Sequence, residues 1–348
     1  MSSFAGPAET LRLSVMVPAR NEEDVLQGCL ESLVRQSEED FRLGTHWELL
    51  VADDHSTDCT RAIAEHMEGV TVLSPDEPPQ GWTGKANALW TAARRAQGEW
   101  FLFTDADTVH EPGDLKRALE EAGSGHLALL SYSPRQRVSG FWQRALMPVV
   151  FSELALAYPP GKVSDPASRV AAANGQFLMV RRNAYFEVGG HSAVPGSLLE
   201  DLDLAALFKR RRYSIGFRYA PDALSTRMYR SAGAMVEGWT KNLARLFAQP
   251  LLLAAWRMLD LLLVVALPLL VWALFSHPLQ RYALLAVWAH ALWRFFSRVA
   301  GSNFPAADCA LALFGMPLFC MLLLRSWFDH VIRRRVVWKG RQYSTGRI

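Results

Sequence analysis

The segment EWFLFTDADTVHEPG, from Glu99 to Gly113, decides the fold prediction. Its bulky apolar run, Trp100 to Phe103, is typical of a buried strand, and two carboxylates, Asp105 and Asp107, follow it with one alanine between them. In an extended backbone, residues two apart point to the same side. The segment therefore predicts a strand that ends by presenting two carboxylates to one ligand.

Strands and helices alternate around this segment across the first 250 residues. Short apolar strands are expected at 13–17, 47–54 and 70–74, and a helical pattern follows each of them. Asn21 is expected to cap the first helix, because its side chain suits an N-cap position. Repeated β-α units of this length predict an α/β fold with a doubly wound parallel sheet that helices cover.

The composition excludes several classes of protein. The 348 residues are 50% hydrophobic with a formal net charge of +3, which argues against disorder and gives no case for nucleic-acid binding. The four cysteines have no CxxC spacing, so neither a zinc site nor a disulfide framework is indicated. The N-terminus has no basic start followed by an apolar core. We therefore expect no cleaved signal peptide and a cytosolic N-terminal part.

A shift toward apolar residues near position 250 predicts a membrane region. Of three apolar runs, 261–279, 282–293 and 309–324, the first and third approach the roughly 20 residues that a spanning helix needs. Basic residues flank the region, which favours both ends in the cytosol and an even number of spans. The expected parts are a cytosolic catalytic domain at 1–248, two or three transmembrane or interfacial helices at 249–328, and a basic C-terminal tail at 329–348.

Two carboxylates placed close together repel each other unless a cation lies between them. Mg²⁺ and Mn²⁺ are bound through one or two carboxylates together with phosphate oxygens of a substrate. A lone DxD is more often a solvated acidic turn, but this one follows a buried strand, and Asp53 and Asp54 end another strand. The loop GWTGKANA adds Lys85, a point charge suited to phosphate, without the spacing of a P-loop. The pattern favours a diphosphate–metal site beyond the carboxyl ends of the strands.

Six motifs occur in the order found in one enzyme family: VPARNEE, VADDHSTD, GKANAL, FTDAD, AANGQFLMVRR and LLEDLDLA. From about residue 13 to 245 the chain thereby resembles the family 2 glycosyltransferases. The resemblance implies the GT-A fold, a doubly wound, mainly parallel sheet, followed here by the C-terminal α-helical membrane region. Within the family the chain looks most like membrane-bound enzymes that glycosylate carotenoids, hopanoids and related isoprenoid lipids, which share GWTKN (238–242) and WKGR (338–341). The Gln-x-x-Arg-Trp motif of the polysaccharide synthases is missing, so processive synthesis is not expected.

The resemblance implies roles for the residues at the matching positions. A divalent metal, Mn²⁺ or Mg²⁺, is expected on Asp105 and Asp107. Asp201 is expected to act as the catalytic base, with Glu200 beside it. The expected donor-binding residues, which would hold a nucleotide sugar, are Pro18, Ala19, Arg20, Glu22, Asp53, Asp54, Lys85 and Asp105.

The residues expected on the acceptor side or at the membrane interface are Asn174, Gly175, Gln176, Trp239 and Lys241. The first three would line the pocket or form a plain turn before a strand. The last two would contact the acceptor or anchor the interface. His191 is expected to be an extra metal ligand or a surface residue, and the apolar stretch 141–160 suits an interfacial entrance for an apolar acceptor.

These expectations describe an inverting glycosyltransferase that moves a sugar from a nucleotide donor, UDP by preference, to a hydroxyl of a membrane isoprenoid or lipid. The protein is expected in the cell (inner) membrane as a multi-pass protein with a cytoplasmic catalytic domain. Its expected partners are the nucleotide sugar, the lipid acceptor and the membrane, without nucleic acid. Three alternatives stay open: a polyprenyl-phosphate sugar transferase, a nucleotidyltransferase of similar sheet architecture, and a non-catalytic membrane protein that binds nucleotide sugars.

Overall fold

The computed structural model describes residues 11–274, 277–338 and 341–344, and it contains two compact units. The first unit comprises the chain up to Arg137 together with Pro160–Arg227. The second comprises Val138–Pro159 and the chain from Met228 onward. The second unit therefore begins before position 248, the boundary expected from the sequence. It includes Val138–Pro159, which interrupts the first unit along the sequence, and no change in composition indicates this insertion.

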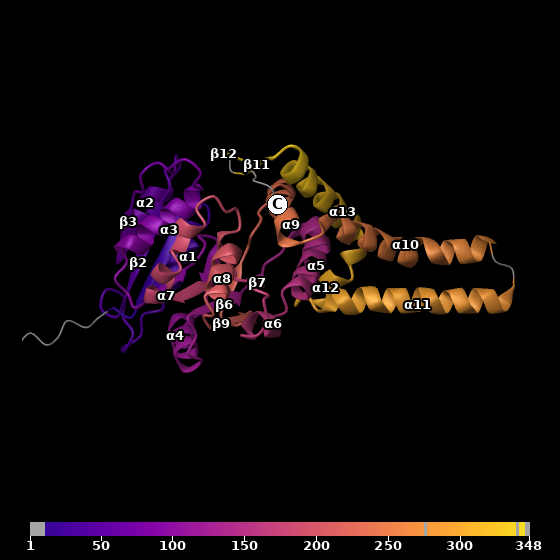
Figure 1. The fold of residues 1–348 in the computed structure, drawn as a ribbon, viewed down its shortest axis with the longest axis horizontal. Coiled ribbons are helices and arrows are strands. Elements are labelled where there is room, and N and C mark those ends of the chain that lie inside the picture. The colour runs from indigo at the N-terminus through magenta and orange to yellow at the C-terminus, as the bar shows by residue number, and fades with distance from the viewer. Residues whose placement is uncertain (1–10, 275–276, 339–340, 345–348) are drawn as a thin grey trace, which may run out of the picture. The chain divides into compact units, whose positions relative to one another are not determined.

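The first unit is built on a seven-stranded sheet (Figure 1). Its strands are β1 (Leu13–Ala19), β2 (Trp47–Asp53), β3 (Val70–Leu73), β4 (Trp100–Phe103), β6 (Leu129–Ser133), β8 (Leu178–Arg181) and β9 (Ile215–Tyr219). They follow the order β3-β2-β1-β4-β8-β6-β9. Neighbouring strands are parallel except for β8, which runs antiparallel to β4 and β6. The predicted α/β class and mainly parallel sheet are confirmed.

Helices and a second, smaller sheet complete the first unit. The helices are α1 (Leu26–Val34), α2 (Thr60–His66), α3 (Gly84–Arg95), α4 (Asp114–Ser124), α6 (Pro160–Ser164), α7 (Arg182–Glu187), α8 (Glu200–Arg210) and the 3-10 helix η1 (Gly190–Ala193). The smaller sheet contains β5 (Thr108–His110), β7 (Arg135–Gln136) and β10 (Leu224–Thr226), with β10 in the middle.

Strand β4 is the apolar run of the segment that decided the fold. All four of its residues are buried, and it pairs in parallel with β1, with Trp100 opposite Leu13. Gly98 passes so close to β1 that a Cβ there would lie 2.5 Å from the Ser14 backbone nitrogen. The strand therefore lies in the middle of the sheet, and the acidic residues follow it at the carboxyl edge of β1 and β4.

The helix after β1 begins later than expected. Asn21 does not cap it, because Asn21 has a φ of 51° and its side chain accepts a hydrogen bond from the Thr57 backbone nitrogen at 2.9 Å. Helix α1 starts at Leu26 without a side-chain cap. The Glu22 backbone nitrogen donates to the Thr60 hydroxyl at 2.7 Å, so the intervening residues form a loop tied to the segment after β2.

The second unit is mainly helical. Its elements are α5 (Gly140–Ala157), α9 (Ala232–Leu246), α10 (Pro250–Leu274), α11 (Pro278–Ala300), α12 (Ala306–Cys309), α13 (Ala312–Trp327), the π-helix η2 (Phe328–Ile332) and the antiparallel strands β11 (Arg335–Trp338) and β12 (Arg341–Ser344). Two stretches, Pro250–Leu274 and Ala312–Ile332, are long and apolar enough to cross a membrane. They contain most of the first expected run and most of the third, whereas the middle run lies in α11. Lys339 and Gly340 of the WKGR element lie outside the described residues.

Helix α5 covers the stretch that was expected to meet the membrane surface. Leu146, Val149 and Val150 are instead buried in the core of the helical unit. Phe141 and Trp142, in its first turn, are about half exposed. Most of this stretch is therefore core, and Phe141, Trp142 and Leu156 are its exposed large apolar side chains.

Candidate active site

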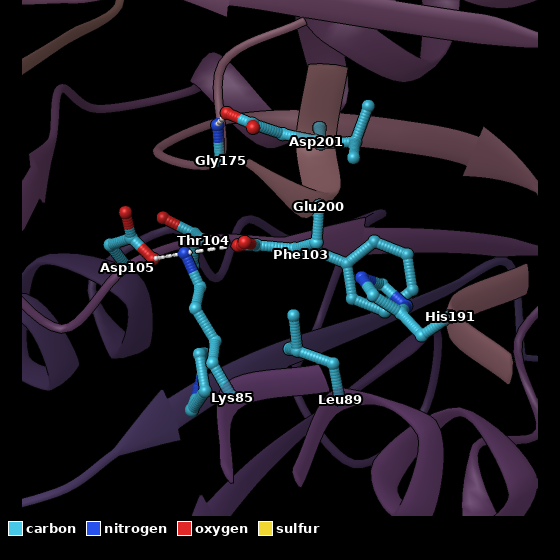
Figure 2. A pocket seen from close by; sticks show the side chains of 11 residues that line it. Lys85, Leu89, Phe103, Thr104, Asp105, Gly175, His191, Glu200 and Asp201 are labelled. Carbon is cyan, nitrogen blue, oxygen red and sulfur yellow. Dashed lines mark hydrogen bonds and ion pairs between the residues drawn. The ribbon is translucent and has the colours of Figure 1, made fainter. Parts of the chain in front are cut away.

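A cavity lies at the carboxyl ends of β1 and β4, where sheets of this kind bind ligands. Its lining residues are Pro18, Lys85, Leu89, Phe103, Thr104, Asp105, Gly175, Leu178, His191, Glu200 and Asp201 (Figure 2). Residues from five of the six sequence motifs thus meet in one place, and only the VADDHSTD motif contributes none.

Lys85 connects the acidic groups of this cavity. It lies in the first turn of α3, which Thr83 caps by accepting a hydrogen bond from the Ala86 backbone nitrogen at 3.1 Å. Its Nζ is 2.8 Å from Asp105 Oδ1 and 2.7 Å from Glu200 Oε1 (Figure 2). Burial alone would lower the pKa of Lys85, but the carboxylates of Asp105 and Glu200 outweigh it and raise this pKa well above its usual value. The ammonium group is therefore charged and held in place.

Asp201 lies beside this ion network, in the first turn of α8. Its Oδ2 accepts a hydrogen bond from the Gly175 backbone nitrogen at 2.7 Å, and its Oδ1 accepts one from the Leu202 backbone nitrogen at 2.8 Å. Burial, and after it the charge of Glu200, raises the pKa of Asp201 to about 6, while Lys85 opposes the shift. A carboxylate with this pKa is suited to accept a proton near neutral pH.

Gly175 leaves open the point on which the reactive groups converge. A Cβ at this position would lie 3.1 Å from Lys85 Nζ, 3.5 Å from Asp201 Oδ2 and 3.6 Å from Asp105 Oδ2. The cation, the expected base and the expected metal ligand thus surround one small space. A Cβ there would occupy this space, and Lys85 Nζ would have to shift by a few tenths of an ångström to admit it, which is a physical reason for glycine.

The backbone is not extended between the two carboxylates of the FTDAD motif. The chain turns at Ala106–Asp107, where the Thr108 backbone nitrogen donates to the Asp105 carbonyl at 3.2 Å. Asp105 lines the cavity and Asp107 does not. The extended backbone assumed beyond Phe103 is therefore wrong, and whether Asp107 shares one ligand with Asp105 stays a prediction.

The fit of this site to a divalent metal rests on Asp105. Among the described residues, no three histidine, cysteine or carboxylate side chains are arranged to hold a metal on their own. A metal that arrives with a diphosphate needs only one or two carboxylates from the protein. The Asp105 side chain is 30% exposed and already pairs with a cation, the Lys85 ammonium. The residues present therefore fit a metal that is bound together with the donor, and metal binding by Asp107 stays a prediction.

The other expected donor residues lie at the ends of β1 and β2. Arg20 Nη1 is 3.2 Å from the Asp54 carbonyl and 3.5 Å from Asp54 Oδ2. Asp53 Oδ1 accepts a hydrogen bond from the Ser56 backbone nitrogen at 3.4 Å. Of the expected donor residues in this part of the chain, Pro18 is the one that lines the cavity. The cavity therefore contains Lys85, Asp105 and Asp201, whereas the carboxylates of Asp53 and Asp54 are not among its lining residues.

The remaining acceptor-side residues have structural partners. Asn174 forms a turn in which its side chain accepts a hydrogen bond from the Gln176 backbone nitrogen at 3.0 Å. The buried Gln176 side chain donates to the Thr226 hydroxyl at 3.2 Å. In the helical unit, Trp239 is 3% exposed, and the Lys241 carbonyl lies 2.7 Å from a ring nitrogen of His330. Trp239 is therefore a core residue, and its contact with an acceptor stays a prediction.

A buried polar chain behind the cavity was not predicted. His110 Nδ1 is 2.7 Å from Asp114 Oδ2, and its Nε2 is 3.0 Å from the Thr104 hydroxyl, which donates to the Gln176 carbonyl at 2.8 Å. The side chains of His110 and Asp114 are fully buried. In the sequence, the feature that could have indicated this pair is the spacing of four residues between His110 and Asp114, at the start of α4. This chain of hydrogen bonds ties Thr104, which precedes Asp105, to Gln176, which follows Gly175.

His191 is not a surface residue, because it is 1% exposed. Its role as an extra metal ligand stays a prediction. Its Nδ1 is 2.8 Å from the Tyr185 hydroxyl, and burial lowers the pKa of His191 to about 4. It therefore lines the cavity as a neutral side chain.

A mainly parallel sheet with these ionic groups at its carboxyl edge is the architecture of a GT-A glycosyltransferase. The family model of Glycosyl transferase family 2 matches residues 14–186, and this part of the chain belongs to that family. It is 24% identical to 4,4'-diaponeurosporenoate glycosyltransferase of Staphylococcus aureus (strain MRSA252), over 95% of this chain and 88% of that protein. It is 28% identical to the enzyme of the same name from Staphylococcus haemolyticus (strain JCSC1435), over 68% of this chain and 62% of that one.

One solved structure supports the fold independently. The mannosyltransferase PcManGT from Pyrobaculum calidifontis, in complex with GDP-Man and Mn²⁺, superposes with a TM-score of 0.55 at 18% identity. The match covers 95% of this chain and 90% of that one. The GT-A fold and the glycosyltransferase activity expected from the sequence are confirmed.

Proposed function

We propose that this glycosyltransferase moves a sugar from a UDP-sugar to a hydroxyl group of a membrane isoprenoid or related lipid, with inversion at the anomeric carbon. The observation that carries the proposal is the convergence of Lys85, Asp105 and Asp201 around Gly175. The carotenoid-type names of the relatives support the acceptor class. The two apolar stretches of the helical unit fit an acceptor that is presented in a membrane.

Asp201 is the proposed general base. The Gly175 N–H holds one carboxylate oxygen, and the pKa of about 6 leaves the group largely ionised at neutral pH. Asp201 takes the proton from the acceptor hydroxyl while that oxygen attacks the anomeric carbon. The bond to the nucleoside diphosphate breaks on the opposite face, which inverts the configuration.

Lys85, held by Asp105 and Glu200, is proposed to bind the negatively charged diphosphate of the donor. When the diphosphate enters, the Lys85 ammonium can exchange Asp105 for phosphate oxygens while Glu200 keeps it in place. A preorganised cation at this point stabilises the charge that develops on the departing diphosphate. Glu200 therefore orients Lys85 and also tunes Asp201.

A divalent metal, Mn²⁺ or Mg²⁺, would be held by Asp105 and Asp107 together with the donor phosphates. Its chemistry would be to neutralise the charge of the leaving diphosphate. The nucleoside would lie along the ends of β1 and β2, where the donor residues still to be tested are Pro18, Ala19, Arg20, Glu22, Asp53 and Asp54.

We further propose a multi-pass protein of the cell (inner) membrane with the catalytic unit in the cytoplasm. A lipid acceptor presents its hydroxyl group at the membrane surface, so an enzyme anchored in the membrane meets it without extracting it. The exposed Phe141 and Trp142 in the first turn of α5 are the apolar groups proposed to meet the acceptor.

The test uses the full chain in detergent. Binding of a panel of UDP-sugars is measured with and without Mn²⁺ or Mg²⁺, for the wild type and for Asp105→Ala/Asp107→Ala. Turnover is measured with a lipid extract, and Asp201→Asn is compared with Asp203→Asn, a change on the same helix. Asp203 Oδ2 accepts a hydrogen bond from Ser197. We expect metal-dependent binding that the double variant loses, and a loss of turnover of about 10²–10⁴-fold in Asp201→Asn with donor binding retained.

The products separate the alternatives. A glycoside confirms transfer to a hydroxyl, whereas a sugar on a polyprenyl phosphate identifies the phosphate acceptor instead. Release of pyrophosphate would identify a nucleotidyltransferase. Normal turnover in Asp201→Asn would remove that residue from the role of base, and metal-independent binding that survives in the double variant would refute the proposed metal site.

A further inference from the structure

Helices α10 and α11 turn apolar side chains outward along most of their length. On α10, Leu269 and Trp272 are 69% and 77% exposed, and on α11 Leu279 and Tyr282 are 73% and 71% exposed. The two helices run side by side (Figure 1). A contiguous exposed apolar surface marks contact with a membrane or with another protein.

A hydrogen bond between the two helices favours the membrane. Pro268 lies inside α10 and has no N–H, so the Val264 carbonyl four residues earlier loses its helical donor. The Trp288 indole nitrogen of α11 donates to this carbonyl at 2.9 Å. In water such a carbonyl would be hydrated, but in hydrocarbon it needs a partner from the protein. The α10–α11 hairpin thus supplies the hydrogen-bond donor for the Val264 carbonyl from its own Trp288, and no water molecule is needed there.

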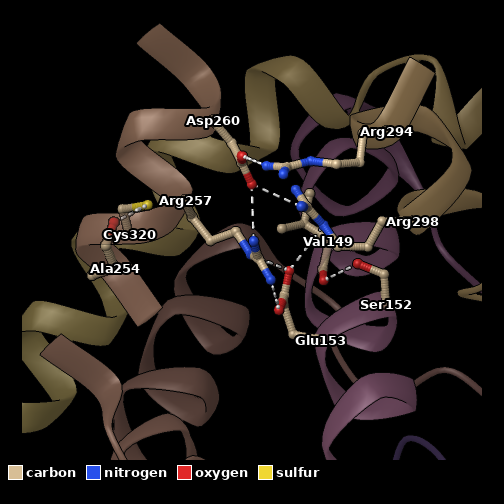
Figure 3. A network of polar contacts seen from close by, with 9 residues as sticks. All are labelled: Val149, Ser152, Glu153, Ala254, Arg257, Asp260, Arg294, Arg298 and Cys320. Atoms are coloured by element: carbon tan, nitrogen blue, oxygen red, sulfur yellow. Dashed lines mark hydrogen bonds and ion pairs between the residues drawn. The ribbon is translucent and has the colours of Figure 1, made fainter. Parts of the chain in front are cut away.

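A network of charged side chains joins α10, α11 and α5 at the level of Asp260 (Figure 3), and apolar side chains of α10 such as Leu252 and Trp256 are exposed before this level too. Asp260 of α10 is 2.9 Å from Arg257 and 2.8 Å from Arg298, and it also contacts Arg294. Arg257 Nε reaches Glu153 of α5 at 2.7 Å. The Arg294 side chain is 56% exposed, so this level of the unit faces water or lipid headgroups.

Aromatic and basic side chains appear at both ends of the hairpin. Trp256 and Trp293 are 56% and 65% exposed and lie next to the charged network in the sequence. At the other end, the Arg281 guanidinium lies 5.2 Å from the centre of the Trp272 ring. Tryptophan with arginine is typical of membrane interfaces. From Arg281 to Arg294, α11 rises about 20 Å, and arginine side chains that extend toward the headgroups at both ends bring this length closer to the ~30 Å of a hydrocarbon core.

Helix α13 also exposes apolar side chains, such as Phe314 and Met321, but a larger share of it than of α10 is buried against the protein. A Cβ on Gly315 would lie 2.0 Å from the Ala145 carbonyl oxygen, so α13 packs directly against the backbone of α5. The Ser326 hydroxyl accepts a hydrogen bond from the Ala244 backbone nitrogen of α9 at 2.8 Å. Helix α9 contains Glu237, Lys241 and Arg245, and charged groups of this kind are costly in hydrocarbon. The partners of α13 therefore keep it out of the bilayer.

We propose that the membrane anchor is the α10–α11 hairpin, inserted in a phospholipid bilayer. The chain enters and leaves on one side, with the charged network at the near headgroups and Arg281 at the far headgroups. Helix α13 stays outside the hydrocarbon. The inference rests on the proposed membrane localisation and specifies it: the two spans are α10 and α11, which gives the even number that the basic flanks require.

The test is the sidedness of single cysteines in the full chain. The exposed Cys59 serves as the marker of the catalytic unit, because the other three cysteines are buried. In a Cys59→Ser background, Gln280→Cys, Ala307→Cys and Arg333→Cys report the tip, the segment after α11 and the segment after α13, all at exposed positions. A membrane-impermeant maleimide is applied to right-side-out and to inside-out vesicles. We expect Gln280→Cys to be labelled from the side opposite to Cys59, and the other two from the same side as Cys59.

Each other result overturns the proposal in a recognisable way. Ala307→Cys on the side of the tip would make α13 the second span. Arg333→Cys on the far side would make three spans, and a tip labelled from the side of Cys59 would show that the hairpin does not cross. Release of the protein by carbonate washing would refute membrane insertion itself, and sugar transfer measured on the same preparation tests the catalytic proposal independently.

Discussion

Substituting Glu200 and Lys85 separately should move the pH dependence of sugar transfer in opposite directions. Burial and the Glu200 charge raise the pKa of Asp201 from 3.8 to about 6, and Lys85 lowers it. The rise is about two pH units, and burial supplies the largest part of it. Glu200→Gln should therefore move the acid limb of kcat/KM to lower pH by about one unit or less. Lys85→Met should move the limb to higher pH.

The assay is kcat/KM for sugar transfer between pH 4.5 and 9 at a fixed metal concentration, because this parameter reports groups of the free enzyme. A limb displaced by one unit corresponds to about 1.4 kcal/mol of interaction between the charges. Asp203→Asn, on the same helix but bonded to Ser197, serves as the control and should leave the limb in place. A limb that stays fixed in both variants, or that moves the same way in both, would show that Asp201 is not the titrating base.

Four further changes test the site and the packing around it. The pKa of Asp201 is higher in the folded chain than its ordinary 3.8, so its contribution to stability is complete below pH 3.8 and is lost as the pH rises through about 6. In urea unfolding, the free energy of unfolding of Asp201→Asn should therefore rise relative to that of the wild type by up to about 3 kcal/mol between pH 4 and 8. A constant difference between the two proteins would contradict the raised pKa. Gly175→Ala should lower kcat by about 10²-fold while Tm stays unchanged, because its Cβ fills the space between the reactive groups; full activity would mean that this space is not used. Gly315→Ala should lower the free energy of unfolding by about 1–3 kcal/mol, because its Cβ would lie 2.0 Å from a carbonyl oxygen of α5. An unchanged Tm in thermal unfolding would refute that close approach. Asp114→Asn should cost about 3 kcal/mol because it leaves the buried His110 without its carboxylate, and an unchanged denaturant midpoint would show that the pair contributes nothing.

The sheet and the chemistry of the cavity were accessible from sequence because they depend on local patterns. A buried strand that runs into Asp105, and an alanine-rich helix that opens with Lys85, are recognisable from neighbouring residues alone. The antiparallel strand β8 was not accessible, because its place between β4 and β6 is decided by pairing between segments far apart in the chain. The bond between Gly175 and Asp201 depends on that pairing as well.

Local preference also misled at particular residues. Asn21 has the right side chain for a helix cap, but its αL backbone and its bond to Thr57 place it in a loop. The backbone was assumed to stay extended from Asp105 to Asp107, but it turns directly after the strand. His191 in a Gly-Gly-His loop suggested an exposed side chain, yet Tyr185 and the neighbouring ring of Phe103 enclose it. Tertiary contacts decided the outcome for Asn21 and His191, and a local turn decided it at Asp107.

The insertion of residues 138–159 into the helical unit has a consequence for any attempt to separate the two units. A protein shortened at residue 248 would keep α5 but lose α10, α11 and α13, which cover it. The side chains of Leu146, Val149 and Val150 would then face water in an otherwise soluble fragment. Such a fragment is a candidate for aggregation and not a minimal enzyme. A stable catalytic fragment would have to omit α5 too and join Arg137 to Pro160 by a short polar linker, with the chain ending near Arg227.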